Sequence, residues 1–273
     1  MNSNIPLFDS LTHPTPNGDW LNPKYHGTNT FEALLKQMRT ENVNWCFAVG
    51  MGPTVGNYEE ETYARLVRSY SENLFPIAFL DFQRLGSVVE IDNYLGKLKS
   101  LGYVGIKIHP RLSQITYDHF LMAPLLRRAG SAGLLVLLCS YCYEPNQRCI
   151  RNNLEQLQGL LLSVSPTRII ILHGGSVRLL EMAEVIRSCD NLLLDLSYTM
   201  CKYEGSSLDL DIKFLFRRFD QRICVGSDNP EFSLAELRRR FNFFSEGVPE
   251  EKLIRIAHGN LLDFLKLKPD AIL

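Results

Sequence analysis

The stretch RIIILHGGSVRLLEMAEVIRSCDNLLLDLSY, residues 168 to 198, decides the fold. It begins with an almost wholly apolar run, continues with apolar residues at every third or fourth position, and ends in a second apolar run. Parallel strands buried on both faces are apolar nearly throughout, whereas a spacing of three or four is typical of an amphipathic helix. The stretch therefore predicts one strand–helix–strand unit of a parallel sheet.

The same alternation continues along the whole chain, and eight rounds can be counted. The predicted strand stretches are residues 6–13, 45–50, 74–81, 104–110, 134–141, 168–175, 191–198 and 222–228. Helical periodicity is found at residues 30–42, 57–73, 88–102, 117–133 and 176–188. Eight rounds in about 250 residues predict an α/β protein with a (β/α)8 TIM barrel. Because no linker interrupts the pattern, we expect a single domain over residues 1–273.

The alternative fold is an open, doubly wound sheet. Such a sheet normally carries a glycine-rich phosphate loop after its first strand, and FDSLTHPTPNGDW (residues 8–20) contains none. The barrel is therefore favoured.

Composition and the N-terminal residues indicate which classes of partner to expect and where in the cell the protein is located. The chain has 29 basic and 30 acidic residues and a net charge of −1, so neither nucleic acid nor an anionic membrane surface is an expected partner. Arg238, Arg239 and Arg240 in ELRRRF predict a solvated helix face. The N-terminus lacks a secretory pattern and the seven cysteines are an odd number, so we expect a cytoplasmic protein with reduced thiols, as a monomer or a homodimer.

Reactive side chains gather where the predicted strands end. In a barrel these ends meet around one pocket, so such residues are candidates for an active site. Taken singly, each is more often a hydrogen-bonded structural residue, and their convergence is what favours function. They are Asp9 and His13 on the first strand, Lys107 and His109 on the fourth, Cys139 on the fifth, His173 on the sixth, Asp195 on the seventh and Asp228 on the eighth.

Five motifs in order along the chain are FDSLTH, GIKIHP, ILHGG, CVGSDNP and RIAHGNLLDFL. With them the chain resembles the amidohydrolase superfamily, in particular its amidohydrolase-2 branch of compact barrel hydrolases and decarboxylases. The resemblance covers nearly the whole chain. It places Leu11 and His13 where the family has His-x-His, and Cys139 where the family usually has a metal-ligating histidine. The resemblance thus implies an incomplete set of metal ligands.

The resemblance also implies roles for the remaining residues. His173 matches a histidine that polarises the substrate or binds metal, and Asp228 matches the aspartate that touches the metal and takes a proton from its water. Because leucine has no lone pair, a single ion, with zinc expected, would depend on His13, Cys139 and Asp228. Without a metal, Asp228 would activate water directly and Lys107, Arg111 or His173 would stabilise the carbonyl oxygen.

The first hypothesis is a hydrolase of a small amide, lactone or other cyclic carboxyl derivative, in which Asp228, His173 and Lys107 are catalytic. We expect the small-molecule substrate, with or without a carboxylate of its own, to contact His109, Arg111, Trp20 and Tyr141. The alternatives are a metal-free lactonase, a decarboxylase of an unsaturated acid, and a barrel that has lost catalysis and binds a ligand. A metal-dependent nuclease is disfavoured, because an acidic ligand would be expected where the chain has Lys107 and His109.

Two further patterns lie close to the predicted strand ends. CSYC, with Cys139 and Cys142, has the spacing of a redox or zinc motif, but no second pair accompanies it, so Cys139 is either the fifth-strand ligand or a core thiol. The long loop after the first strand carries Trp20 and Tyr25 and predicts a lid or a substrate wall.

Overall fold

The computed structural model describes residues 5–52, 55, 58–141, 154–187 and 189–267. Eight strands form one sheet in the order of the sequence, and each pairs in parallel with the next. They are β1 (Leu7–Thr12), β2 (Val43–Val49), β3 (Leu74–Phe79), β4 (Gly105–Ile108), β5 (Leu135–Cys139), β6 (Ile169–Leu172), β7 (Leu192–Asp195) and β8 (Ile223–Cys224).

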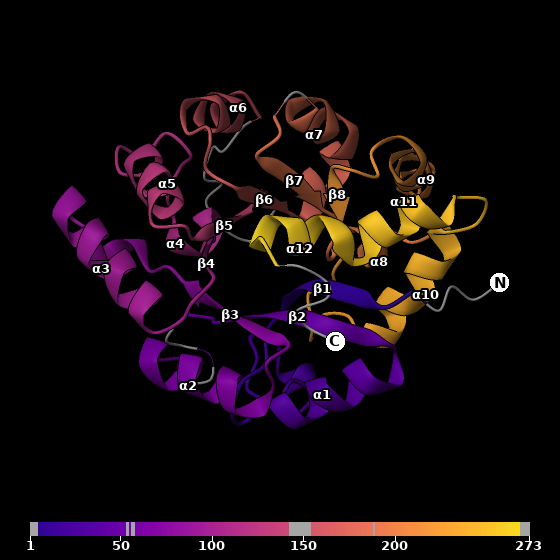
Figure 1. The fold of residues 1–273 in the computed structure, drawn as a ribbon, viewed down its shortest axis with the longest axis horizontal. Helices are drawn as coiled ribbons and strands as arrows, with labels where there is room; N and C mark the ends of the chain where they lie inside the picture. Colours follow the sequence, from indigo (N-terminus) through magenta and orange to yellow (C-terminus); the bar gives the residue numbers. More distant parts are fainter. Residues whose placement is uncertain (1–4, 53–54, 56–57, 142–153, 188, 268–273) are drawn as a thin grey trace.

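The sheet closes between its first strand and the segment that follows its last. The Ser10 N–H donates to the Val225 carbonyl at 3.1 Å, and the His13 N–H donates to the Asn229 carbonyl at 2.9 Å. Figure 1 shows the strands as a ring with the helices outside it. The predicted TIM barrel is confirmed. The prediction of one domain over residues 1–273 extends beyond the described residues and stays a prediction.

Helices connect successive strands, and each predicted helical stretch contains one. The α-helices are α1 (Phe31–Thr40), α2 (Glu60–Tyr70), α3 (Val88–Ser100), α4 (Pro110–Ser113), α5 (Met122–Ser131), α6 (Leu154–Ser163), α7 (Leu179–Ile186), α8 (Thr199–Lys202), α9 (Leu208–Arg218), α10 (Leu234–Phe244), α11 (Glu250–Ile254) and α12 (Asn260–Leu265). Short 3-10 or π turns are η1 (Pro23–Tyr25), η2 (Phe82–Arg84), η3 (His173–Arg178) and η4 (Arg255–Gly259).

The buried apolar side chains form two main cores. The larger fills the layer between the strands and the surrounding helices. The smaller lies inside the barrel, where Phe8 contacts the rings of Trp45, Phe47 and Phe75. Leu261 and Leu262 of α12 belong to this inner core. Because α12 lies across the ring of strands (Figure 1), it closes the end of the barrel at which the strands begin.

The expectation that Arg238 to Arg240 form a solvated face is wrong for two of the three residues. Arg240 is 2% exposed, and its guanidinium bonds to Asp209 and to the Met200 carbonyl. The Arg238 guanidinium donates to three backbone carbonyls, among them that of Ile5 at 3.0 Å. Only Arg239 is exposed. The guanidinium groups anchor α10 because each can satisfy several carbonyl acceptors at once.

Two observations bear on the expected environment. No helix in the described ranges is long and apolar enough to span a membrane. The cysteines that the structure describes are all free thiols: Cys46, Cys139, Cys189, Cys201 and Cys224. Cys142 of the CSYC motif lies outside the described residues. The cytoplasmic location and the oligomeric state stay predictions.

Candidate active site

A pocket of about 340 Å³ lies where the strands end. It gathers most of the residues predicted for the site, from β4 and from the connections that follow β1, β4, β5, β6 and β8. Its lining consists of His13, Trp20, Leu21, Met51, Lys107, His109, Arg111, Leu112, Tyr141, His173, Tyr198, Lys202, Asp228 and Glu231. Three of the strand-end candidates are not in the lining, because Asp9, Cys139 and Asp195 are buried, at 0%, 2% and 0% exposed.

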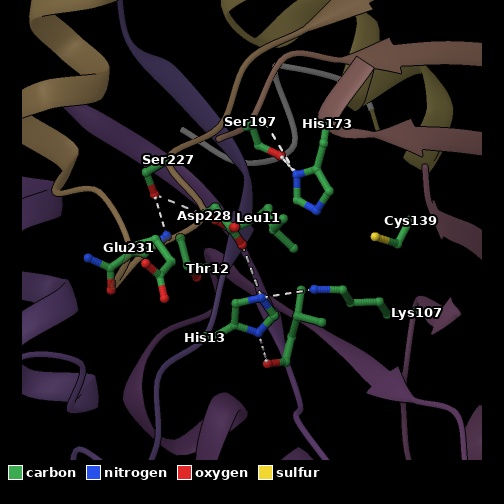
Figure 2. A network of polar contacts seen from close by, with 12 residues as sticks. Leu11, Thr12, His13, Lys107, Cys139, His173, Ser197, Ser227, Asp228 and Glu231 are labelled. Atoms are coloured by element: carbon green, nitrogen blue, oxygen red, sulfur yellow. Dashed lines mark hydrogen bonds and ion pairs between the residues drawn. The ribbon is translucent and has the colours of Figure 1, made fainter. Parts of the chain in front are cut away.

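His13 lies at the centre of the polar contacts (Figure 2). Its Nδ1 lies 2.9 Å from the Val49 carbonyl, which can only accept, so Nδ1 carries a proton. Burial, with the nearby Lys107 ammonium, lowers the pKa of His13 to about 4. The ring is therefore neutral at neutral pH, and the lone pair of its Nε2 accepts a hydrogen bond from Lys107 Nζ at 3.0 Å.

Asp228 lies on the other side of His13, with Oδ1 at 3.4 Å from Nε2. Burial alone would raise the pKa of Asp228, but the positive charges of His173 and Lys107 hold it well below its usual range. Burial lowers the pKa of Lys107, while Asp228 and Cys139 oppose that shift. The pocket floor thus holds an ionised carboxylate and an ammonium group beside one neutral imidazole.

Cys139, at the end of β5, lies between two imidazoles. The Nδ1 atom of His109 accepts from the Leu112 N–H, so its Nε2 carries the proton and donates to Cys139 Sγ at 3.8 Å. Burial would raise the pKa of the Cys139 thiol, but the contacts with His109 and His173 lower it well below its usual value. Burial lowers the pKa of His173, and the charges of Cys139 and Asp228 outweigh this effect and raise it.

The residues expected to hold zinc do not form a fitting ligand set. Leu11 stands at the position of the missing histidine. Its side chain packs in the inner apolar core and has no atom that can bind a metal. The Nε2 lone pair of His13 is already bonded to the Lys107 ammonium. Within the described residues, no group of three or more His, Cys, Asp or Glu side chains could hold a metal ion. Zinc bound by His13, Cys139 and Asp228 stays a prediction that the donor geometry does not support.

The loop after β1 forms one wall of the pocket, as its length predicted. Trp20 Nε1 donates to Glu231 Oε1 at 2.7 Å, and the Tyr25 hydroxyl donates to the Glu231 carbonyl at 3.2 Å. The Trp20 ring packs against His13, with 5.1 Å between centroids. These bonds connect the β1 and β8 loops over the Asp228 side of the pocket.

Two charged residues of the lining were not identified from the sequence. Glu231 follows the VGSDNP motif directly, which is a usable signal. Lys202 lies on α8, beyond the end of β7, and only the turn at Tyr198 directs that helix to the pocket, so no spacing pattern reveals it.

The backbone is strained at three positions of the lining. His173, Tyr198 and Asp228 have φ values of +65°, +62° and +60°, in the left-handed region that residues with a Cβ avoid. They follow β6, β7 and β8, respectively. Such conformations persist only where surrounding contacts fix them, and they occur preferentially at functional sites. This clustering is independent support for the pocket as the active site.

A larger groove, of about 790 Å³, lies between α3 and α5 on the outside of the barrel. It contains the exposed ion pair of Arg128 and Asp92. It lies away from the strand ends and none of the predicted site residues lines it. The smaller pocket therefore remains the candidate site.

Comparisons with known proteins give a likeness of fold. No family model matches the chain, and no curated protein matches it. Among solved structures, an uncharacterised TIM-barrel protein from Bordetella bronchiseptica has 16% identity and a TM-score of 0.78, over 95% of this chain and 98% of that chain. A dihydroxybenzoic acid decarboxylase from Polaromonas, solved with manganese and 2-nitroresorcinol, has 13% identity and a TM-score of 0.72, over 100% and 99%.

A protein described as amidohydrolase II has 15% identity and a TM-score of 0.58, over 95% of this chain and 99% of that chain. The resemblance expected from the sequence motifs is thus confirmed for the fold, which this chain has in common with hydrolase-type and decarboxylase-type barrels. Sequence identities this low show no common reaction.

Proposed function

We propose that the pocket hydrolyses a small lactone or ester, with water held by Asp228 as the nucleophile and the Lys107 ammonium as the electrophile. One observation carries the proposal. Lys107 Nζ lies 3.0 Å from the Nε2 of a neutral His13, and Asp228 Oδ1 lies 3.4 Å from the same nitrogen. A cation and a base are thereby held side by side on the pocket floor.

Asp228 is suited to orient water. Its side chain is 13% exposed, whereas that of His13 is 1% exposed, so the carboxylate is the member of the pair that solvent reaches. Because the pKa of Asp228 is held low, the carboxylate stays ionised but is a weak base. Such a base suffices for an activated carbonyl with a good leaving group. The proposal therefore favours lactones and esters over amides.

Lys107 is suited to stabilise the negative charge that develops on the carbonyl oxygen. An ammonium group has three N–H donors, and one of them bonds to His13. The remaining donors are available to the substrate. A positioned cation in a buried site stabilises an oxyanion far more than it would in water.

His173 supplies the proton that the leaving group requires. Its Nδ1 lies 3.3 Å from the Ser197 carbonyl and therefore carries a proton. Its raised pKa favours the imidazolium form, in which Nε2 also carries a proton. The water oxygen bonds to the carbonyl carbon and gives a proton to Asp228. The carbon–oxygen bond then breaks, and His173 protonates the leaving oxygen.

The mouth of the pocket suits a substrate with a carboxylate of its own. The Arg111 guanidinium lies over the Tyr141 ring, 5.4 Å from its centroid, and Lys202 Nζ lies 6.0 Å from the centroid of Tyr198. The two tyrosine rings contact each other edge to face at 5.4 Å. The mouth therefore offers aromatic surface between two cations.

The test is a hydrolysis assay on carboxylated lactones and aryl esters, with excess chelator and separately with zinc. We expect turnover in chelator, and a loss of about a hundredfold or more in Asp228→Asn. Asp81→Asn, a carboxylate on the η2 turn outside the pocket, serves as the matched control. Turnover that requires zinc, together with about one ion per chain by elemental mass spectrometry, would overturn the metal-free mechanism.

A second candidate is decarboxylation of an unsaturated acid. It is favoured by the aromatic lining of Trp20, Tyr141 and Tyr198 and by the decarboxylase among the structures of similar fold. Release of carbon dioxide from hydroxybenzoates, with no ester hydrolysis, would select it. If neither reaction occurs but a carboxylated ligand raises the melting temperature, the chain is a binding barrel, because a ligand that binds the native state stabilises it.

A further inference from the structure

Two carboxylates that the proposed mechanism does not use lie fully buried beneath the pocket. They are Asp9 on β1 and Asp195 at the end of β7, and both are 0% exposed. Ser10, Ser197 and Ser227 bond to them. We name these five residues the carboxylate network. A buried carboxyl group is costly unless it is hydrogen-bonded, and the three serines supply such bonds.

Asp195 accepts four hydrogen bonds from N–H and O–H groups, and a fifth, longer one from the Cys224 thiol at 4.0 Å. Its Oδ1 accepts from Ser10 Oγ at 2.5 Å and from the Ser197 N–H at 3.1 Å. Its Oδ2 accepts from the His173 N–H at 3.2 Å and from the Ser197 hydroxyl. Both carboxylate oxygens are thereby fully used, because an ionised carboxyl has about four acceptor positions.

Ser197 connects Asp195 to the His173 ring. Both the carbonyl and the hydroxyl oxygen of Ser197 lie 3.3 Å from His173 Nδ1 (Figure 2). The Thr199 hydroxyl also bonds to the His173 carbonyl, at 2.7 Å. His173 is therefore held at its backbone N–H by Asp195 directly, and at its ring through Ser197.

The close approach of β8 to this network depends on a glycine. A Cβ at Gly226 would lie 2.2 Å from Ser10 Oγ and 3.1 Å from Asp9 Oδ1. The glycine of the VGSD motif thus allows the network to form next to the strand that carries Asp228. The VGSD motif therefore contains both Gly226, which leaves room for the network, and Asp228, the carboxylate of the pocket.

We propose that Asp195 is a positioning residue, which holds His173 in its left-handed conformation with the ring Nε2 directed into the pocket. The role of His173 as the proton donor rests on the proposed function, whereas the positioning itself does not. Asp195 lies too deep to touch a substrate, since no atom of it is exposed. Its effect on the reaction is transmitted through the backbone of His173 and through Ser197.

The substitution Asp195→Asn separates positioning from packing, because the two side chains have nearly the same shape. An amide has one acceptor oxygen and one NH2 group. If the NH2 replaces Oδ2, it faces the His173 N–H, and if it replaces Oδ1, it faces the Ser197 N–H. A backbone N–H cannot rotate to become an acceptor. The first orientation therefore breaks the direct bond to His173, and the second weakens the connection through Ser197, which keeps only its hydroxyl bond to Asp195.

Asp9→Asn provides the matched control. Asp9 Oδ1 accepts from the N–H groups of Leu11 and Ser227, and Oδ2 accepts from Ser227 Oγ at 2.5 Å. An amide oxygen can replace Oδ1, and an amide NH2 in place of Oδ2 can donate to the Ser227 hydroxyl. This variant also replaces a carboxyl group of the same network by an amide, but it leaves the hydrogen bonds intact.

The experiment combines crystal structures of both variants with kinetics on an ester or lactone that the wild type hydrolyses. In Asp195→Asn we expect the φ of His173 to leave the left-handed region and kcat to fall by about a hundredfold with little change in KM. In Asp9→Asn we expect an unchanged His173 and a kcat within about threefold of wild type. An unmoved His173 in a folded Asp195→Asn, or equal losses in both variants, would overturn the proposal.

Ser197→Ala keeps the test decisive if Asp195→Asn does not fold. It retains the carboxylate and removes the hydroxyl that contacts the His173 ring. We expect the ring to rotate, with a smaller loss of kcat, and a ring that keeps its orientation would count against positioning through Ser197. If the wild type hydrolyses none of the esters, the proposed function fails, while the crystal structures still decide the positioning of His173.

Discussion

The two ends of the barrel interior are built from the same strands and differ in every physical respect. At the end closed by α12, the Phe8 ring contacts those of Trp45 and Phe47 within the inner apolar core. At the other end, His13 and Lys107 are as buried as those rings, yet they carry the polar contacts of the pocket. Apolar packing at the closed end stabilises the fold. At the open end, the burial of charged groups away from water costs part of that stability.

Leu11 marks the boundary between the two ends. It belongs to the inner apolar core, and His13, two residues later, belongs to the pocket. A histidine at Leu11 would extend the polar end one layer deeper. Because it is leucine, the apolar packing reaches up to the pocket floor, and an ammonium group provides the positive charge beside His13. Four substitutions or measurements test this division, beginning with the largest effect.

Phe8→Ala should produce the largest change, and only at the closed end. The ring is fully buried and contacts three other rings, so its removal leaves a cavity that rigid strands cannot fill. We expect the free energy of unfolding to fall by about 3–5 kcal/mol in urea titrations. The kcat of the protein that remains folded should be unchanged. A comparable loss of kcat would show that the two ends are not independent.

Lys107→Met tests the open end, where we expect a loss of activity. The substitution keeps the length and the apolar stem of the side chain and removes the ammonium that bonds to His13. We expect kcat/KM to fall by about 10²- to 10³-fold, as for loss of one oxyanion donor. The melting temperature should fall, because the buried Asp228 carboxylate loses one of the positive charges that compensate it.

Lys202→Met is the matched control for this result, because Lys202 lines the mouth of the same pocket on an exposed side chain. It should raise KM with little effect on kcat. If both lysine variants change kcat and KM in the same way, Lys107 acts only by attracting the substrate, and the pocket floor has no role distinct from that of the mouth.

The closed end and the barrel could be predicted from the sequence because they depend on patterns that repeat. Each strand is a short apolar run and each helix has a period of three to four, so eight copies of one signal reinforce one another. The buried Arg240 escaped prediction for the opposite reason. Its burial depends on Asp209 of a neighbouring helix, and no local pattern encodes that contact.

The open end could be predicted only in part. The strand-end rule located His13, Lys107, His173 and Asp228 correctly, since the topology alone brings strand ends together. It did not indicate that Lys107 would bond to His13, or that His109 would face Cys139. Those pairings depend on the directions of side chains from three strands, β1, β4 and β5, and these directions follow from register and twist, which sequence spacing does not specify.

Cys139 and Cys224 give a smaller test of the same division, since both are buried thiols on strands. Burial raises the pKa of Cys224 well above its usual value, with the nearby Asp195 adding to the effect, whereas the two imidazoles lower that of Cys139. A free thiol is only a few per cent thiolate at pH 7, so full ionisation raises reactivity by up to roughly thirtyfold. We expect iodoacetamide to label Cys139 well before Cys224, as measured by peptide mass spectrometry. Simultaneous labelling would contradict the assigned ionisation of Cys139.

The net dependence of stability on pH is the smallest effect, because Asp9 and His13 contribute to it with opposite signs. Burial raises the pKa of Asp9 from its ordinary value of 3.8 to about 7 in the native state. Above pH 3.8 the native state therefore keeps a proton that the unfolded chain has released. This contribution to stability is complete below that pH and is lost as the pH rises toward 7, by at most about 1.4 kcal/mol per pH unit.

His13 contributes with the opposite sign. Because its pKa is lowered from 6.5 to about 4, it stabilises the native state above pH 6.5 and loses that contribution as the pH falls. The two terms therefore oppose each other between pH 4 and 6.5. Asp9→Asn removes the first term, so its melting temperature should rise with pH across this window more steeply than that of the wild type. Parallel curves for the two proteins would mean that Asp9 is already ionised in the native state, held by the donors of Ser227 and Leu11 alone.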